Sequence, residues 1–224
     1  MTREIVVFWN VDNNRSAAAY EAGIKRLTRK RGIRRRRPAI LGLCETTNAD
    51  LPALKNYRRI RDRKPDGRGN LTMYVRRNLP VTDIEWVDLD FTWPNTQRPG
   101  THWPRSILAV TIGSLRTAIW HAPPNNAKNA PAGQREGIRE LRRLRPHLVL
   151  GDWNRRKGDS HGPSTLAQRL PNGRVRGHRI DAAVIAFNTG GSNVKYPKMS
   201  GDHGHAFEMT FRAPARLWKK PSKK

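Results

Sequence analysis

Cysteine, acidic residues and long apolar runs are all scarce in this sequence. Cys44 is the only cysteine among 224 residues, which excludes an internal disulfide and a zinc site built from several cysteines. No stretch approaches the roughly 20 apolar residues that a membrane-spanning helix needs, and the short apolar run 5–9 is not a secretory signal. We therefore expect a soluble, cytoplasmic protein of a reducing compartment, with no membrane partner.

The scarcity of acidic residues makes the charge balance informative. Lys and Arg total 44 against 18 Asp and Glu, for a formal net charge of +26. This excess is too large for solubility alone and indicates a polyanionic partner. Nucleic acid is the stronger candidate and an acidic membrane surface the weaker one, and no obligate protein partner is implied. The length suits one domain, expected over residues 1–214, followed by a basic tail at 215–224.

Apolar segments alternate with polar turns in a pattern typical of strands with a few helices. Strands are predicted at 5–9, 39–44, 71–76, 81–89, 105–112, 115–120, 148–150, 180–187 and 206–211. Helical spacing of apolar residues covers 17–31, 134–144 and 164–170. Loops are predicted at 93–102 and 172–179, and Gly113-Ser114 as the turn of a hairpin.

Several of these strands run into polar turns. In Leu148-Val149-Leu150-Gly151-Asp152-Trp153-Asn154, a glycine that permits a sharp turn is followed by a carboxylate and an amide. Alone, this pattern fits an ordinary Asx turn as well as a metal or phosphate site. Five strand ends in all carry such residues: Asn10 and Asp12, Glu45, His121, Asp152 and Asn154, and Asp202 and His203. Because ligands bind at the carboxyl ends of strands in open α/β sheets, a metal-dependent phosphate site is the simplest explanation.

The segments around these residues resemble the ordered motifs of the endonuclease/exonuclease/phosphatase superfamily, which includes deoxyribonuclease I and the apurinic/apyrimidinic endonucleases. The matching segments are Trp9-Asn10-Val11-Asp12, Leu43-Cys44-Glu45-Thr46, Trp120-His121-Ala122-Pro123, Gly151-Asp152-Trp153-Asn154, Arg179-Ile180-Asp181 and Ser200-Gly201-Asp202-His203. They span residues 9–203. The resemblance implies an α/β (α+β) four-layered sandwich, with two packed, mostly antiparallel sheets flanked by helices.

The resemblance also implies a metal site. Glu45 resembles the principal Mg²⁺ ligand of the family, and Asn10 and Asp12 lie close to the metal and phosphate. Asp202 occupies the place of a metal-site carboxylate. Oxygen ligands suit Mg²⁺, which retains waters and needs only one or two carboxylates, and Mn²⁺ is an alternative.

The catalytic roles follow from the same matching positions. Asp152 resembles the carboxylate that orients or deprotonates the attacking water, and Asn154 the amide that binds a phosphate oxygen. His203 resembles the histidine at the scissile phosphate, and Asp181 its partner. His121 occupies the place of a residue near the leaving group. A histidine paired with a carboxylate is held in one orientation, which suits proton transfer beside a phosphate.

Basic residues in the predicted loops beside Asp152 and Asp181 are candidates for binding nucleic acid. They are Arg155, Arg156, Lys157, Arg174, Arg176 and Arg179. Contacts of this kind position a backbone without reading its sequence; generic surface charge is the alternative. The arginines at 34–37 are instead expected at the opposite edge from Glu45, and those of the helix 134–144 on its solvent-exposed face.

These observations predict a Mg²⁺-dependent phosphodiesterase, a metal-dependent phosphodiester hydrolase that acts on DNA as a low-specificity endonuclease. A nuclease for abasic sites or 3′ ends, or a ribonuclease, is the first alternative. His178 stands where abasic-site enzymes carry a bulky aromatic residue, which disfavours the abasic-site function. The alternative of a different class is a non-catalytic basic nucleic-acid-binding protein on the same fold.

Overall fold

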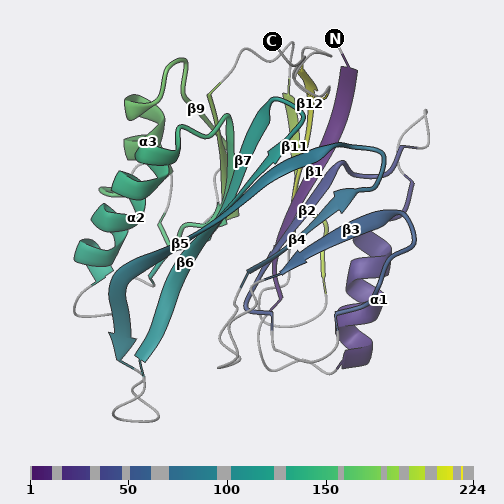
Figure 1. The fold of residues 1–224 in the computed structure, drawn as a ribbon, viewed down its shortest axis with the longest axis horizontal. Helices are drawn as coiled ribbons and strands as arrows, with labels where there is room; N and C mark the ends of the chain where they lie inside the picture. Colours follow the sequence, from purple (N-terminus) through teal and green to yellow (C-terminus); the bar gives the residue numbers. More distant parts are fainter. Residues whose placement is uncertain are drawn as a thin grey trace.

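Two six-stranded sheets pack face to face and carry helices on their outer sides (Figure 1). The computed structural model describes residues 2–11, 17–30, 36–46, 51–61, 71–94, 102–123, 130–155, 159–177, 181–186, 192–199, 206–213 and 218. The strands are β1 (Thr2–Asn10), β2 (Ile40–Cys44), β3 (Tyr57–Arg61), β4 (Leu71–Arg76), β5 (Val81–Pro94), β6 (His102–Ile112), β7 (Leu115–His121), β8 (Leu148–Asp152), β9 (Arg174–Arg176), β10 (Asp181–Ile185), β11 (Ser192–Lys195) and β12 (Phe207–Ala213). The helices are α1 (Ala17–Leu27), α2 (Ala130–Leu144) and α3 (Pro163–Arg169).

The sheets are mostly antiparallel, as predicted. The first has the strand order β11-β12-β1-β2-β4-β3 and the second β5-β6-β7-β8-β10-β9. Within the described residues, only the pairs β1–β2 and β7–β8 are parallel. Because parallel neighbours end at the same edge of a sheet, these two pairs determine where the strand-end residues meet.

Three hydrophobic layers separate the four layers of secondary structure. Strand β1 shows why its apolar run is continuous: Val6 and Phe8 face the core between the sheets, whereas Val7 and Trp9 face α1. Helices α2 and α3 cover the second sheet, where Trp120 packs with residues of both helices. The predicted four-layered sandwich is confirmed (Figure 1).

The predicted elements differ from the structure mainly where strands carry arginine or proline. Strand β3 was not expected, because its sequence Tyr-Arg-Arg-Ile-Arg has only two apolar residues. Strands β5 and β6 extend into the predicted loop 93–102, since they continue as a pair through Pro94 and His102. Strand β9 lies inside the predicted loop 172–179.

The segment predicted as a tail contributes to the core. Trp218 is buried in the cluster between the sheets, and its ring centroid lies 6.3 Å from that of Phe211. The burial of Trp218 was not predicted, because a single tryptophan among basic residues gives no periodic pattern; the boundary at 215 stays a prediction. Among the described helices, none combines the length and the apolar character needed to cross a lipid bilayer.

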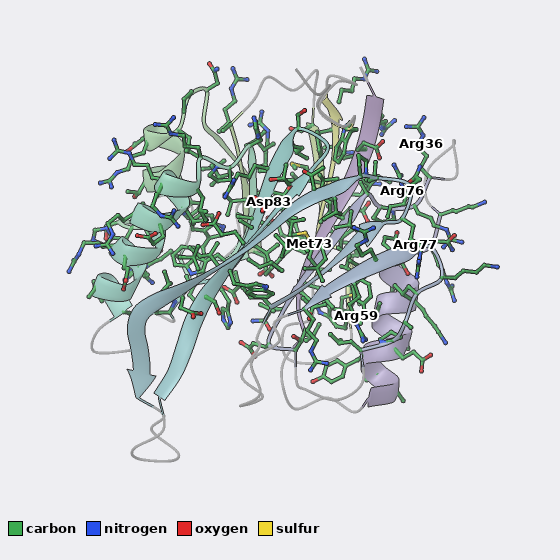
Figure 2. All side chains as sticks on the ribbon, viewed as in Figure 1. Arg36, Arg59, Met73, Arg76, Arg77 and Asp83 are labelled. Carbon is green, nitrogen blue, oxygen red and sulfur yellow. The ribbon has the colours of Figure 1, made fainter. Side chains whose placement is uncertain are left out.

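Arginines stabilise the end of β1 that lies opposite Asn10 (Figure 2). The side chain of Glu4 is buried, and Arg76 and Arg36 place guanidinium nitrogens 3.3 Å and 3.9 Å from its carboxylate oxygens. Arg37 donates a hydrogen bond to the Thr28 carbonyl. Arg36 and Arg37 thus lie at the edge expected for them. Arg36 offsets the charge of Glu4, and Arg37 satisfies the Thr28 carbonyl just after α1.

Candidate active site

One amide joins carboxylates from the two sheets. Asn10 ends β1, Glu45 follows β2, and Asp152 ends β8 in the other sheet. The Asn10 Nδ2 group donates hydrogen bonds to Glu45 Oε1 at 3.0 Å and to Asp152 Oδ2 at 2.9 Å. Asn10 and Asp152 are both buried. The meeting of strand ends expected from the sequence is therefore present for these three residues.

The two parallel strand pairs produce this arrangement. In the first sheet Asn10 pairs with Cys44, so that Glu45 is the next residue beyond the pair. In the second sheet His121 pairs with Asp152. The His121 Nε2 atom lies 3.4 Å from Glu45 Oε1 and 3.9 Å from Asp152 Oδ2. His121 thus joins the same cluster, and its imidazole nitrogen faces both carboxylates.

Glu45 has an unusual backbone conformation. Its φ of 55° places it in the left-handed region, which a residue with a Cβ atom adopts at a cost of roughly 1–2 kcal/mol. The side chain is 21% exposed, in contrast to the 1% of Asp152. Residues held in sparsely populated conformations cluster at functional sites. This conformation brings the Glu45 carboxylate to Asn10 while leaving part of it accessible.

The turn after β8 is an Asx turn and belongs to the same site. Asp152 Oδ1 accepts a hydrogen bond from the Asn154 backbone N–H at 2.9 Å, while its Oδ2 faces Asn10. Asn154 has a φ of 47°, which asparagine tolerates. Its Nδ2 donates to the Ala122 carbonyl at 2.8 Å, and the amide has a second N–H to offer a ligand. The two interpretations of this segment are thus compatible.

Gly151 serves a different purpose from the one predicted. It lies within β8 and pairs with Trp120, so the turn starts only after Asp152. A Cβ atom at this position would lie 2.5 Å from the Trp120 carbonyl oxygen. Close approach of the backbones therefore requires the glycine. Trp153 packs edge-on against Trp120 at 5.3 Å and donates to the Ala182 carbonyl, so it supports the turn from the core.

Asp181 lies beside the cluster. It begins β10, pairs with Asp152 and is buried. Its predicted partner, His203, lies outside the described residues, and so do five other predicted site residues. These five are Asp12, Arg156, Lys157, Arg179 and Asp202. The roles predicted for all six remain predictions.

Arg155 is anchored by a residue that the sequence analysis missed. Its Nε group donates to Gln134 Oε1 at 3.0 Å, and the Gln134 Nε2 group donates to the Pro123 carbonyl at 2.9 Å. Gln134 is fully buried on α2. The sequence pattern that could have identified Gln134 is a polar residue at helical spacing with Ile138 and Leu141, on the apolar face of α2. Gln134 thereby ties the loop after His121 to the turn after Asp152.

Arg174 and Arg176 lie on a strand, and their predicted loop placement is wrong. Strand β9 pairs with β10, with Arg176 opposite Ala183 and Arg174 opposite Ile185. Ile185 in turn pairs with Leu148, at the start of β8. Since Asp181 is four residues from Ile185, Arg174 lies roughly 13 Å along the strand from Asp181. Arg176 is near the edge of the second sheet that carries His121, Asp152 and Asp181, whereas Arg174 is toward the opposite edge.

Comparison with known proteins gives matches in structure but not in sequence. No protein-family model and no curated protein matches the chain. The chain is similar to TDP2 from D. rerio complexed with single strand DNA product, with a TM-score of 0.64, 14% identity, and coverage of 95% of this chain and 100% of that one. It is also similar to an endonuclease/exonuclease/phosphatase family protein from Bacteroides thetaiotaomicron, with a TM-score of 0.63, 14% identity, and coverage of 95% and 99%.

A third similar structure is the endonuclease domain of TRAS1, a telomere-specific non-LTR retrotransposon. Its TM-score is 0.54 at 13% identity, over 94% of this chain and 99% of that domain. The chain has the endonuclease/exonuclease/phosphatase fold. The resemblance stated from the motifs is therefore confirmed for the fold, over nearly the whole chain.

On the endonuclease/exonuclease/phosphatase fold, the donor set of this chain suits a hard cation better than a softer one. Within the described ranges, no three His, Cys, Asp or Glu side chains form a group that could hold a metal ion. Mg²⁺ needs fewer protein ligands, and the partly exposed Glu45 beside Asp152 fits that requirement. Asn10 turns its amide nitrogen toward the carboxylates, so it positions them, and its predicted role as a ligand remains a prediction.

Proposed function

We propose that this protein is a Mg²⁺-dependent phosphodiesterase that hydrolyses DNA as a low-specificity endonuclease. The main observation behind the proposal is that the Asn10 amide hydrogen-bonds both Glu45 and Asp152, with His121 beside them. The net charge of +26 favours a nucleic-acid substrate over a small phosphate. Two similar structures support the choice, since one was solved with a single strand DNA product and another is an endonuclease domain.

Phosphodiester hydrolysis needs an oriented oxygen nucleophile and a proton for the leaving oxygen. Asp152 is held through both carboxylate oxygens, by Asn10 and by the backbone of Asn154. This fixed carboxylate would orient the attacking water and accept its proton. The imidazole of His121 would donate a proton at the leaving oxygen, and the second N–H of the Asn154 amide would bind a phosphate oxygen. Groups held in advance in this way need little reorganisation during the reaction.

Glu45 would hold the metal, with waters completing its coordination. When bound, Mg²⁺ supplies positive charge that offsets the negative charge developing on the phosphate. Asp12 and Asp202 are further predicted ligands. Mn²⁺ would serve in the same place, because it accepts the same oxygen ligands.

The proposal is tested by incubating supercoiled plasmid with the wild-type protein, the Asp152→Asn variant and the Asp83→Asn variant. Asp83 is an exposed acid on β5, away from the cluster, and its variant controls for the loss of one negative charge. We expect nicking by the wild type and by Asp83→Asn, and a rate reduced by about 10²- to 10⁴-fold for Asp152→Asn. Chelation of the metal with EDTA should stop cleavage in every case.

Binding of the plasmid without nicking by any variant would refute the nuclease function and favour a non-catalytic binder. Single-stranded DNA, abasic duplex and RNA oligonucleotides in the same assay rank the substrates. Preferential cleavage of RNA or of the abasic duplex would replace the low-specificity DNA endonuclease with the corresponding alternative.

A further inference from the structure

The edge of the second sheet that carries His121, Asp152 and Asp181 is the catalytic edge of the proposed function. A pocket lined by arginines lies at the opposite end of this sheet. Its volume is about 720 Å³, and its lining includes Arg139, Arg142, Arg143, Arg145, His147 and Arg169. These residues come from the C-terminal part of α2, the segment before β8 and the end of α3. All five arginines are exposed, as predicted for those of the helix 134–144. They nevertheless converge on one hollow.

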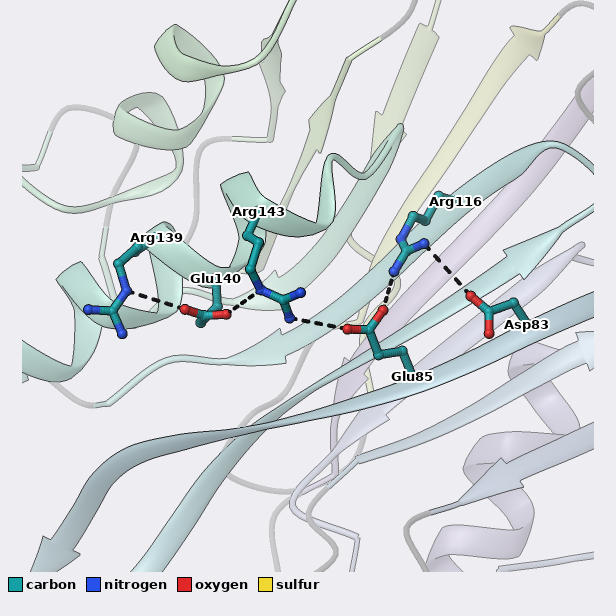
Figure 3. Close-up of polar contacts among 6 residues, drawn as sticks. All are labelled: Asp83, Glu85, Arg116, Arg139, Glu140 and Arg143. Carbon is teal, nitrogen blue, oxygen red and sulfur yellow. Dashed lines mark hydrogen bonds and ion pairs between the residues drawn. The ribbon is translucent and has the colours of Figure 1, made fainter.

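Two of the five arginines are neutralised within the protein (Figure 3). Arg143 bonds Glu140 at 2.7 Å and Glu85 at 3.1 Å, while Arg139 bonds Glu140 at 3.2 Å. The chain of ion pairs continues from Glu85 through Arg116 to Asp83, and it connects α2 with β5 and β7. The carboxylates offset the charges of Arg139 and Arg143, so the net positive charge of the pocket comes from its other arginines.

The guanidinium groups of Arg142, Arg145 and Arg169 make no hydrogen bond or ion pair with the described part of the chain. Arg145 also has a φ of 47°, immediately after the end of α2. Glycine is the usual residue there, because a Cβ atom disfavours the left-handed conformation. The charge of Arg145 interacts favourably with the C-terminal end of the helix dipole. Without an ion-pair partner among the described residues, it is also free to bind a ligand.

Positive charge connects this pocket with the catalytic edge. Arg135, Arg139 and Arg142 recur at i, i+4 and i+7, which places them along one side of α2. Burial lowers the pKa of His161, and so do the nearby charges of Arg135, Arg155 and Arg169. Arg155 lies at the turn after Asp152, and Arg169 lines the pocket. Arg135, Arg155 and Arg169 thus place positive charge around His161, between the pocket and the turn after Asp152.

We propose that a nucleic-acid strand leaves the catalytic edge, crosses α2 and α3, and places backbone phosphates in this arginine-lined pocket. The inference rests on the proposed nucleic-acid substrate and extends its binding site to the far end of the sheet. From Asp152 to His147 the strand rise amounts to roughly 16 Å.

An extended polyanion fits these observations better than a free anion. Guanidinium groups bind phosphate oxygens through paired hydrogen bonds. Arg155, Arg135 and the pocket arginines together extend from the turn after Asp152 to the far end of the sheet. A single phosphate ion would use one end of this track only. An acidic protein segment could follow the same path, because each of its carboxylates can also accept a bidentate hydrogen bond from a guanidinium group. We treat such a segment as an outcome of the test.

The experiment measures binding of fluorescein-labelled single-stranded DNA of 4 and of 16 nucleotides in EDTA, over a series of salt concentrations. One triple variant changes Arg142, Arg145 and Arg169 to Gln. The matched control changes Arg29, Arg58 and Arg77 to Gln, which removes the same charge from exposed positions on the side of the first sheet. The pocket variant should bind the 16-mer about tenfold or more weakly, with a salt slope reduced by about 0.7 for each lost phosphate contact. Its affinity for the 4-mer should match that of the control variant.

Equal losses in the two triple variants would overturn the proposal, because general charge would then explain binding. An equal loss of affinity for polyglutamate of matching length would also overturn it, in favour of an acidic protein ligand. The binding result is independent of catalysis. If the pocket variant binds more weakly but the wild type cleaves no nucleic acid, the nuclease proposal fails and the proposed binding track stands. If the wild type cleaves nucleic acid but the pocket variant binds as tightly as the wild type, the nuclease proposal stands and the binding track fails.

A single substitution separates a ligand-binding role from a structural one. Arg145→Gly removes one pocket charge and relieves the left-handed conformation. We expect a melting temperature equal to or above that of the wild type, together with weaker binding of the 16-mer. A lowered melting temperature with unchanged binding would show that Arg145 serves the helix end and would remove it from the pocket.

Discussion

Glu45 is held against the preference of its own backbone, and that conflict can be measured. Its carboxylate reaches Asn10 only because the residue after β2 adopts a φ of 55°. A glycine would adopt this conformation without strain, so selection for stability alone would not favour glutamate there. The side chain is more simply explained by chemistry at the edge of the sheets.

Replacement of Glu45 by glycine should therefore give a more stable protein than replacement by alanine. We expect the free energy of unfolding to be higher for Glu45→Gly than for Glu45→Ala by about 1 kcal/mol, because only alanine retains the left-handed strain. Both variants should lose plasmid cleavage. Urea denaturation measures the difference, and the opposite order would mean that the backbone at residue 45 relaxes when the side chain is removed.

At the scale of elements, strands with alternating or continuous apolar residues were predictable and those rich in arginine were not. The strand ends at Asn10, Glu45 and Asp152 could be placed together because buried strands, unlike exposed ones, reveal their boundaries in sequence. Strand β9 was not predicted because Arg-Val-Arg contains only one apolar residue. As a result, Arg174 was wrongly assigned to a loop beside Asp181. The bridge through Gln134 depends on how α2 packs against the loop after His121, which no local pattern encodes.

Helix α2 approaches its sheet closely at one point, and this contact makes a testable demand on Gly137. A Cβ atom there would lie 2.2 Å from the Trp120 ring. Alanine normally stabilises a helix interior relative to glycine by about 0.5–1 kcal/mol. Here we expect Gly137→Ala to destabilise the protein by about 1–3 kcal/mol, because the ring or the helix must move.

The effect of Gly137→Ala should reverse sign in a Trp120→Leu background, where the ring is absent. Urea denaturation of the four proteins of this double-mutant cycle measures the coupling between the two positions. Independent effects of the two substitutions would mean that α2 does not rest on the Trp120 ring.

At the scale of the whole molecule, the net charge of +26 destabilises the folded state through repulsion between like charges. The same charge favours binding of a polyanion. Arginines are concentrated on α2, β3 and β9. Their mutual repulsion is screened by salt, since the Debye length falls from about 10 Å at 0.1 M to about 3 Å at 1 M. Added salt should therefore stabilise the folded protein and weaken its binding to nucleic acid.

We expect the melting temperature of the free protein to rise as NaCl increases from 0.1 M to 1 M, while its affinity for single-stranded DNA falls steeply. Differential scanning fluorimetry and fluorescence anisotropy in the same buffers follow the two quantities. A melting temperature that decreases with salt would show that ion pairs such as the Glu85–Arg143 contact outweigh the repulsion.

The neighbours of β1 have a consequence for synthesis of the chain. Strand β1 lies between β2 and β12, and its pairing with β12 joins Thr2–Phe8 to residues about 200 positions later. A ribosome adding 5–20 residues per second needs roughly 10–40 s to cover that distance. During this time the apolar run that includes Val7 and Phe8 lacks one of its two partner strands. The first sheet is thus completed only after the second has been synthesised. Until then β1 has one open hydrogen-bonding edge, and open strand edges favour aggregation.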